Sequence, residues 1–317
     1  MHFQLGLHWP SLTAHKFDVV GVGANSVDHV CVLPAPVQTL GPSGKMPITA
    51  RHVLYGGQTA TTMGACATFG LRASYVGAFG SDAEAQGMRR ALQRSGVDLD
   101  RSVERGAPNA SAVILLDGST GHRIVLWDRS DDLRLRPEEL PADLLVSARL
   151  VHVDDADEEA AIGAARAAAA AGVPVTSDID RITASTEALI AAVTYPIFDQ
   201  QVSLALTGLT DPRRALKKLR RLNTGVLCTT LGDRGAIALE GDHLHVVPAC
   251  KVQVVDSTGA GDVFRAGFIY GLLAGWEFER VLRFANAAAA LSCTKLGALA
   301  SVPSLPEVQG LVASGTS

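Results

Sequence analysis

The chain has 317 residues, enough for one large α/β domain or two smaller ones with a substantial core. Its 47% apolar and 19% charged residues are typical of a globular protein and exclude a disordered chain. The formal net charge of −4 gives no general attraction to nucleic acid, and no uncharged apolar run is as long as a membrane span. We therefore expect neither a nucleic-acid partner nor a membrane partner.

The cysteines and the N-terminal residues indicate the cell compartment. The five cysteines are scattered, odd in number and never spaced as CxxC, which favours reduced thiols in a cytoplasmic protein over disulfides or a zinc site. The first sixteen residues lack the basic and apolar regions of a signal peptide. We expect residues 1–16 and 309–317 to be terminal extensions outside the folded domains.

The chain opens with a strand at 17–23 that ends in the turn 23–26, because a β-branched run stops at glycine. Asp28 follows at the carboxyl side of this strand, where open α/β sheets place their ligands. A solvated loop aspartate is the alternative. Prolines and glycines interrupt residues 30–54, which excludes a helix and favours a small flap of strands and turns.

Residues 55–98 return to helical and strand patterns. The pair Gly56-Gly57 predicts a turn before a small-residue helix that stops at Gly70, and a strand, loop and helix then end near Gly96. Two extended runs, 110–116 and 122–127, are separated by the hairpin signal 117–121. Together with residues 30–54, these runs predict a second, all-β unit inserted between βα units.

After Pro137 the alternation is regular. We expect a helix near 138–146, a strand at 149–153, a helix at 157–171 and a strand at 173–177. Asp154 could reach a substrate, but we favour a cap on the following helix. Strands are also expected at 195–198 and 224–230, followed by a hairpin at 236–246. His243 and His245 share a strand face there, but without a third ligand they do not predict a metal site.

The most informative stretch is 254–268, where a β-branched run ends in a small-residue turn and a buried helix follows. Gly259 and Gly261 let the backbone bend sharply and approach a ligand closely. The free N–H groups of a helix's first turn suit a phosphate. An acid at this entrance, Asp262, is explained if it receives a proton from a hydroxyl that attacks the phosphate. An ordinary N-cap is the alternative.

The segment 256–268, Asp-Ser-Thr-Gly-Ala-Gly-Asp-Val-Phe-Arg-Ala-Gly-Phe, resembles the C-terminal signature of the ribokinase-like (PfkB) carbohydrate kinases. Residues 56–70 resemble the N-terminal signature, except that Thr61 stands where the family has asparagine. The resemblance implies an ATP-dependent kinase that phosphorylates a hydroxyl, expected to be a hydroxymethyl group, of a sugar or sugar-like acceptor. Asp262 would be the base, and the N–H groups of Gly259, Ala260 and Gly261 would stabilise the phosphoryl charge.

The same resemblance assigns the ligand contacts. Acceptor contacts would come from Asp28, Gly56, Gly57 and Thr61. Nucleotide contacts would come from Thr230, Gly232, Gly235, Gly261 and Asn286. The family's NxxE, linked to Mg²⁺, is replaced by Asp199 and Val202, so we expect Mg²⁺ to be held mainly by nucleotide phosphates and water. Asp256 and Thr258 would face a monovalent cation such as K⁺ if one binds.

The predicted fold is α/β, with a doubly wound, mostly parallel sheet flanked by helices and a small β lid. The α/β domain would comprise 17–29, 55–98 and 129–308, and the discontinuous lid 30–54 and 99–128. We expect a homodimer. A nucleoside kinase of the same fold, or a catalytically silent sugar or nucleotide sensor, is the alternative. An NAD-dependent dehydrogenase is disfavoured because residues 21–26 lack the third glycine of GxGxxG.

Overall fold

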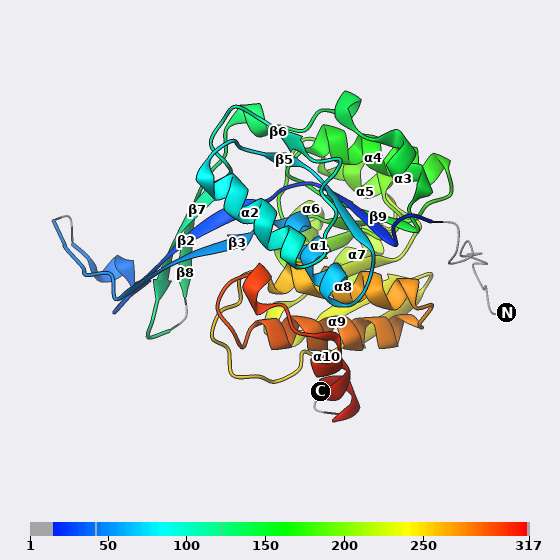
Figure 1. Ribbon diagram of the computed structural model, residues 1–317. Helices are drawn as coiled ribbons and strands as arrows, with labels where there is room; N and C mark the ends of the chain where they lie inside the picture. Colours follow the sequence, from blue (N-terminus) through cyan, green and yellow to red (C-terminus); the bar gives the residue numbers. More distant parts are fainter. Residues whose placement is uncertain (1–14, 42, 121, 316–317) are drawn as a thin grey trace.

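The computed structural model describes residues 15–41, 43–120 and 122–315 (Figure 1). Most of the N-terminal extension expected from the sequence therefore lies outside the described residues. At the other end the expectation for 309–317 is wrong in part, because α10 (Leu305–Ala313) continues the helix to Ala313. Within the described ranges, no helix has the length and apolar character needed to cross a membrane.

A central sheet organises the molecule, as predicted. Its parallel half has the strand order β10 (Val175–Asp178), β9 (Leu150–Asp154), β1 (Val19–Val22), β4 (Ala73–Val76). The other half has the order β11 (Ile197–Asp199), β12 (Leu227–Thr230), β13 (Ala236–Glu240), β14 (His243–Val247). Parallel bridges from Thr176 to Tyr195 and from Ile179 to Phe198 connect the two halves. Only β13 runs antiparallel to the other strands of this sheet, because it is antiparallel to both of its neighbours, β12 and β14.

Helices cover both faces of this sheet, since successive residues of a strand point to opposite sides. Val19 packs with one face, which holds α1 (Gln58–Thr68), α2 (Ala83–Arg94), α8 (Ala260–Leu273), α9 (Phe278–Ser292) and α10. Val20 packs with the opposite face, which holds α3 (Ala142–Ser147), α4 (Glu158–Ala170), α5 (Thr186–Ala192), α6 (Gln200–Thr207) and α7 (Pro212–Leu219). Every residue of the four parallel strands is buried, as expected of a doubly covered sheet.

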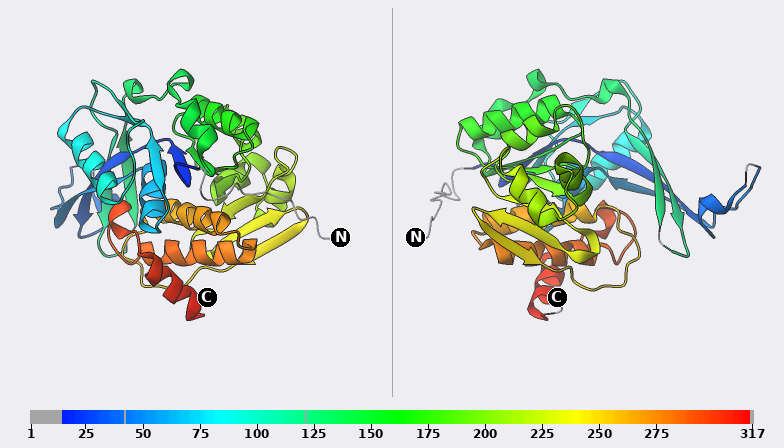
Figure 2. Two further views of the ribbon diagram at one scale, coloured as in Figure 1. Left: turned by 45° about the vertical axis from the view of Figure 1, so that its right-hand side comes forward. Right: turned by 180° about the vertical axis from the view of Figure 1, so that it is seen from behind.

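A separate four-stranded sheet, here called the lid sheet, projects from the α/β body (Figures 1 and 2). Its strand order is β3 (Ala50–Gly56), β2 (Ser26–Leu33), β7 (Ser111–Asp117), β8 (Arg123–Asp128). The predicted hairpin is present as β7 and β8, while β2 pairs in parallel with β7. Because β2 begins at Ser26, Asp28 lies in the lid sheet, whereas the sequence placed the boundary after residue 29.

Two short strands complete the sheets. β5 (Ala78–Phe79) pairs with β6 (Val103–Glu104), so β6 belongs to neither the lid sheet nor the central sheet. Short 3₁₀ helices lie at Val37–Thr39, Asp131–Leu133, Pro137–Glu139, Gly232–Arg234 and Leu299–Ser301.

The predicted helix cap at Asp154 is wrong. One carboxylate oxygen of Asp154 accepts hydrogen bonds from the Ala24 N–H (2.7 Å) and the Thr59 hydroxyl (2.8 Å), and the other accepts from the Ala156 N–H (3.0 Å). Asp157 occupies the cap position of α4, but its carboxylate forms an ion pair with Arg129. Asp154 therefore connects the end of β1 to the start of α1, instead of capping α4.

Candidate active site

The turn before α8 has the geometry that the sequence predicted. Gly259 adopts the left-handed conformation (φ 76°), which favours glycine, and α8 begins at the next residue. Asp262 is the third residue of this helix and is half-buried. The Ala260 N–H, one of the three expected phosphate donors, donates to the Ser257 carbonyl at 3.3 Å in this structure. The first turn of a 14-residue helix is an electropositive site for an anion.

Asp262 lies among other carboxylates. Burial, followed by the nearby charge of Asp178, raises the pKa of Asp262 well above its usual range. Asp180 and Asp154 act in the same direction, and the positive charge of Arg265 opposes them. An aspartate with a raised pKa has a higher proton affinity than a free one, which suits a group that must take a proton from an alcohol.

Three residues expected to contact the acceptor come together at the base of the lid sheet. The Ser26 hydroxyl donates to the Asp28 carboxylate (3.0 Å), and Ser26 pairs with Gly56 across β2 and β3. A Cβ atom added to Gly56 would lie 3.0 Å from Oδ2 of Asp28. Gly57 has φ 95°, and a Cβ atom there would lie 2.4 Å from Cα of Asn25. Glycine at both positions lets the start of α1 approach β2.

A cavity of about 500 Å³, here called the acceptor cavity, opens between the lid sheet and the α/β body. The lid sheet contributes Ser26, Ser111 and Trp127, whose side chain is 71% exposed. The body contributes Gly57 and Asp180, among others. Burial, followed by the charge of Asp155, raises the pKa of Asp180 to about 6. The cavity thus combines an aromatic ring with polar groups, as sugar-sized ligands require.

Thr61, the fourth residue expected to contact the acceptor, is not exposed to the acceptor cavity. It lies in α1 and is fully buried, and in the described part of the chain its hydroxyl has no hydrogen-bond partner. It is not among the residues that line the acceptor cavity. A buried hydroxyl without a partner costs free energy, so this position has capacity for a hydrogen bond that the free protein does not make.

A second cavity, about 690 Å³ and here called the nucleotide cavity, collects all five residues that were expected to contact ATP. Those lining residues are Thr230, Gly232, Gly235, Gly261 and Asn286. Gly235 has φ 94°, and a Cβ atom there would lie 2.1 Å from the Val247 carbonyl oxygen. The Asn286 amide donates to the carbonyls of Val247 (3.1 Å) and Pro248 (3.0 Å), so it holds the loop that forms one wall.

The nucleotide cavity is also lined by Asp199, which together with Val202 stands where the family has the NxxE motif linked to Mg²⁺. The Asp199 carboxylate caps α6 by accepting from the Gln201 N–H (2.7 Å). Val202 is buried in α6, which explains why an apolar residue is tolerated at that position. Asp233 also lines the cavity. Carboxylate oxygens near phosphates fit Mg²⁺, which binds through few protein ligands and keeps several waters.

Asp256 connects two loops beside the α8 turn. Its Oδ1 accepts from the N–H (2.9 Å) and hydroxyl (2.7 Å) of Thr258, and its Oδ2 accepts from the Gly297 N–H (2.9 Å). Asp256 is buried, and among the described residues no cationic side chain forms an ion pair with it. A buried carboxylate without a cationic partner fits a monovalent cation.

A buried polar network that the sequence did not predict fixes the start of the lid sheet. The Asn25 amide donates to the Tyr75 hydroxyl (3.0 Å) and to the Ala78 carbonyl (2.7 Å), and accepts from the Asn109 amide (3.0 Å). The Tyr75 hydroxyl donates to the Gly23 carbonyl (2.8 Å). The only local signal was a short polar turn after β1, since the partners are far away in the sequence.

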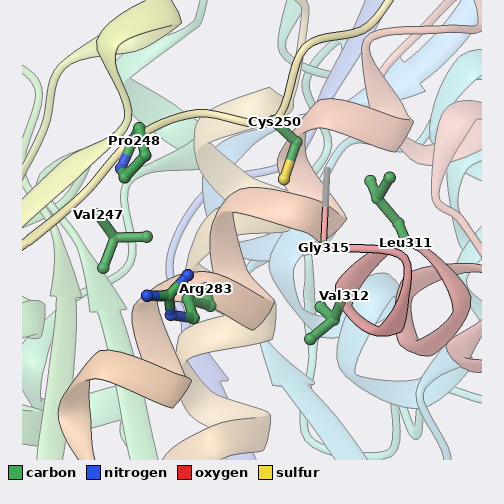
Figure 3. Close-up of a pocket in the computed structure, with 7 residues that line it drawn as sticks. All are labelled: Val247, Pro248, Cys250, Arg283, Leu311, Val312 and Gly315. Atoms are coloured by element: carbon green, nitrogen blue, oxygen red, sulfur yellow. The ribbon is translucent and has the colours of Figure 1, made fainter. Parts of the chain in front are cut away.

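A third hollow lies beside the nucleotide cavity, with which it shares Cys250, between the loop after β14, helix α9 and helix α10 (Figure 3). Arg283 projects from α9 and Leu311 from α10, facing Val247 and Pro248. At about 50 Å³ it holds little more than one or two waters, so it is too small for a sugar or a nucleotide.

Comparison with known proteins identifies the family of the chain. The model of the pfkB family carbohydrate kinases matches residues 25–305. The chain is 25% identical to a nucleoside kinase of Methanothermobacter thermautotrophicus, covering 92% of this chain and 94% of that protein. It is 30% identical to an ATP-dependent ribose-1-phosphate kinase of Halopiger xanaduensis, covering 80% and 86%. The structure of Arabidopsis thaliana ribokinase with ribose and ATP superposes with a TM-score of 0.79 at 25% identity, covering 93% and 98%.

Proposed function

The chain belongs to the pfkB family of carbohydrate kinases, and from this we propose that it transfers the terminal phosphoryl group of ATP to a hydroxymethyl group of a sugar or sugar-like acceptor. One observation carries the proposal. Asp262 lies in the first turn of α8, directly after Ala260 and Gly261, which line the nucleotide cavity. Its pKa is raised by burial and also by the charge of Asp180, which lines the acceptor cavity. A base in this position can act on a hydroxyl that faces a phosphate.

The reaction that this arrangement supports is a direct displacement. The acceptor hydroxyl gives its proton to the Asp262 carboxylate, and its oxygen forms a bond to the γ-phosphorus while the bond to the bridging oxygen of ADP breaks. The backbone at Gly259, Ala260 and Gly261 surrounds the position where negative charge develops. Donors fixed in this way stabilise the transition state more than the ground state.

We assign the acceptor to the space beneath the lid sheet. Asp28 would accept hydrogen bonds from acceptor hydroxyls, the turn at Gly56 and Gly57 would allow close approach, and Thr61 would supply its unpaired hydroxyl. The lid would comprise the predicted segments 30–54 and 99–128 with two boundaries moved: the first to Ser26, where β2 begins, and the second to Ser111, where β7 begins, because β6 lies outside the lid sheet. Burial, together with the nearby charge of Asp256, raises the pKa of Asp28, as expected for a carboxylate enclosed by a lid.

ATP would occupy the nucleotide cavity, against Thr230, Gly232, Gly235, Gly261 and Asn286. Mg²⁺, bound chiefly by the phosphates with Asp199 nearby, would neutralise charge on the transferring group. Asp256 and Thr258 would hold a monovalent cation such as K⁺, whose charge would offset that of the buried Asp256 carboxylate.

A homodimer is supported by the outer face of the lid sheet. Val53, Val113 and Leu126 are exposed (56%, 41% and 56%) and form one row across the sheet with His29. This row faces away from the side that carries Asp28, because adjacent strand residues point to opposite faces. A second copy of the same face would cover it. Leu126→Glu should then convert a dimer into a monomer in sedimentation velocity.

The five cysteines are free thiols, which supports the proposed location in the cytoplasm.

A panel of sugars, polyols and nucleosides, tested with ATP and Mg²⁺ for ADP release, examines the proposed function. Turnover of a sugar or polyol, lowered by roughly 10²–10⁴ in Asp262→Asn, is the expected result. Tight ATP binding with no phosphorylated product from any acceptor would instead favour a sensor. A preliminary thermal-shift screen with an ATP analogue would rank the acceptors, because ligands that bind the folded state raise the Tm.

A further inference from the structure

A buried ion pair lies under the first turn of α8. Nη2 of Arg265 is 2.5 Å from Oδ1 of Asp178, and both side chains are almost completely buried. Asp178 is the last residue of β10, and Arg265 follows Asp262 by three residues on α8. Residues three apart on a helix lie on the same face, so the arginine shares the face that carries the proposed base.

The arginine reaches back toward the phosphate-binding end of its helix, as long helical side chains do. A Cβ atom added to Gly261 would lie 2.7 Å from Nη1 of Arg265. Gly261 therefore leaves room for a guanidinium directly beside the turn. A buried arginine needs a partner with good geometry to offset its loss of hydration, and Asp178 is that partner.

The charges that face Asp262 come from three elements. Asp178 and Asp180 belong to β10 and the loop after it, Asp154 ends β9, and Arg265 belongs to α8 itself. Three of these four groups are acidic and disfavour the ionised form of Asp262, while the arginine favours it. The neighbouring Arg181 is engaged by Asp155 (2.9 Å) and Asp180 (3.5 Å). Arg265 is thus the cation that most directly supports an ionised base.

We propose that Arg265 and Asp178 are positioning residues that set the proton affinity of Asp262, a role that rests on the proposed function of Asp262 as the base. The guanidinium favours the ionised carboxylate that must accept the proton of the acceptor hydroxyl. Asp178 holds the guanidinium in place, and its negative charge partly offsets the effect of the guanidinium charge on Asp262. The two members of the pair therefore act on Asp262 with opposite signs.

The test is a pH titration of the whole chain labelled with ¹³C at the aspartate carboxyl carbons, in which the Asp262 signal is identified by its loss in Asp262→Asn. Arg265→Gln should move the titration of Asp262 to higher pH by about one pH unit, since removal of an adjacent opposite charge has at least that effect. Asp178→Asn should move it to lower pH by a similar amount. The double variant should return toward wild type, and Arg265→Lys, which retains the charge, should shift it less than Arg265→Gln.

Activity provides an independent readout. The acidic limb of the kcat/KM profile, measured with an acceptor from the screen, should shift to higher pH in Arg265→Gln and to lower pH in Asp178→Asn. Arg265→Gln should therefore regain activity as the pH rises. Shifts in the same direction for both single variants, or no shift, would overturn the inference. If Arg265→Gln does not fold, Arg265→Lys and Asp178→Asn still give the two signs. Full activity of Asp262→Asn would instead refute the proposed base, a separate failure.

Discussion

Ala298 packs directly over Gly259: a Cβ atom added to Gly259 would lie 2.6 Å from the Cβ atom of Ala298. The loop that contains Ala298 is also held by Asp256, whose carboxylate accepts the Gly297 N–H. The turn before α8 is thus enclosed by a second loop from the end of the chain. The backbone of the Gly259 turn must keep this conformation if the first turn of α8 is to bind a phosphate.

Gly259→Ala should therefore lower both stability and turnover. The substitution forces a left-handed conformation on alanine, at about 1 kcal/mol or more, and adds the contact with Ala298. Gly241→Ala is the matched control, because Gly241 also has a positive φ (56°) but nothing lies within 4 Å of an added Cβ. Urea unfolding and kcat measure the two effects. An equal loss of stability in both variants, with kcat unchanged, would contradict the importance of this contact.

Asp262→Asn should lower turnover by roughly 10²–10⁴, the usual contribution of a general base, while ATP binding stays near normal. Asp242→Asn, in the exposed turn between β13 and β14, is the control and should behave like wild type. Steady-state kinetics and calorimetric titration with ATP measure the two properties. Turnover of Asp262→Asn within about threefold of wild type, a barrier change under 1 kcal/mol, would exclude the assignment.

The same variant should be more stable than wild type at neutral pH. The folded-state pKa of Asp262 is raised, so its contribution to stability is fully present below the unfolded pKa and is lost as the pH rises through the folded pKa. Asparagine removes this titration and the charge repulsion from Asp178. The Tm difference between Asp262→Asn and wild type should grow from pH 4 to pH 8. A difference that is constant over this range would show that the pKa of Asp262 is the same in the folded and unfolded states, and therefore not raised by folding.

Activity should depend on pH in the direction set by the base. Because Asp262 must be ionised to accept a proton and its pKa is raised, kcat/KM should increase with pH and its acidic limb should lie well above that of an ordinary aspartate, near 4. The profile must be recorded in a buffer series of constant ionic strength, since salt screens the neighbouring carboxylates. A rate that is flat from pH 4 to pH 8 would argue against a perturbed base.

Thr61→Val tests whether the unpaired hydroxyl serves the acceptor. Valine has nearly the same shape, so removing a buried hydroxyl without a partner should leave the free energy of unfolding unchanged or raise it by up to about 1 kcal/mol. If the hydroxyl binds the acceptor, kcat/KM should fall about tenfold. Thr62→Val is a useful comparison, because the Thr62 hydroxyl donates to the Gln58 carbonyl (2.9 Å). Unchanged kcat/KM in Thr61→Val would remove Thr61 from the site.

The lid sheet should become protected when the acceptor binds. β8 is exposed along most of its length, and the sheet is attached to the body through the turn at Asn25 and through Gly56. Amide exchange of residues 30–54 and 110–128 should slow in the presence of acceptor and a non-hydrolysable ATP analogue, whereas β9 should not change. Equal exchange with and without ligands would mean that the lid sheet does not close.

The sequence was sufficient for features that depend on local rules. The turn at Gly259, the hairpin of β7 and β8, and the stop at Gly70 follow from backbone geometry that few other residues accept. The mostly parallel sheet with helices on both faces also followed from the regular alternation of elements. The family resemblance identified the five expected nucleotide contacts that line the nucleotide cavity. Their spacing in the sequence alone would not have shown that they lie together.

Features that depend on distant contacts were not predictable. Asp154 looked like a cap because it precedes a helix, but its partners Ala24 and Thr59 come from elements far earlier in the chain. The pairing of Arg265 with Asp178 likewise joins a helix to a strand nearly ninety residues away. A single sequence carries no signal for such contacts, because the tertiary fold, and not the neighbouring residues in the sequence, determines which side chains meet.

During synthesis, β2 leaves the ribosome well before β7, its parallel partner in the lid sheet. The strand that carries Asp28 therefore cannot pair with β7 until the α/β elements between them have been synthesised. At about 5–20 residues per second this delay lasts several seconds. In that interval β2 can pair only with β3, on its other edge. The nascent chain thus exposes an unpaired apolar strand edge, and we expect newly made protein to need chaperone protection until residue 117 has emerged.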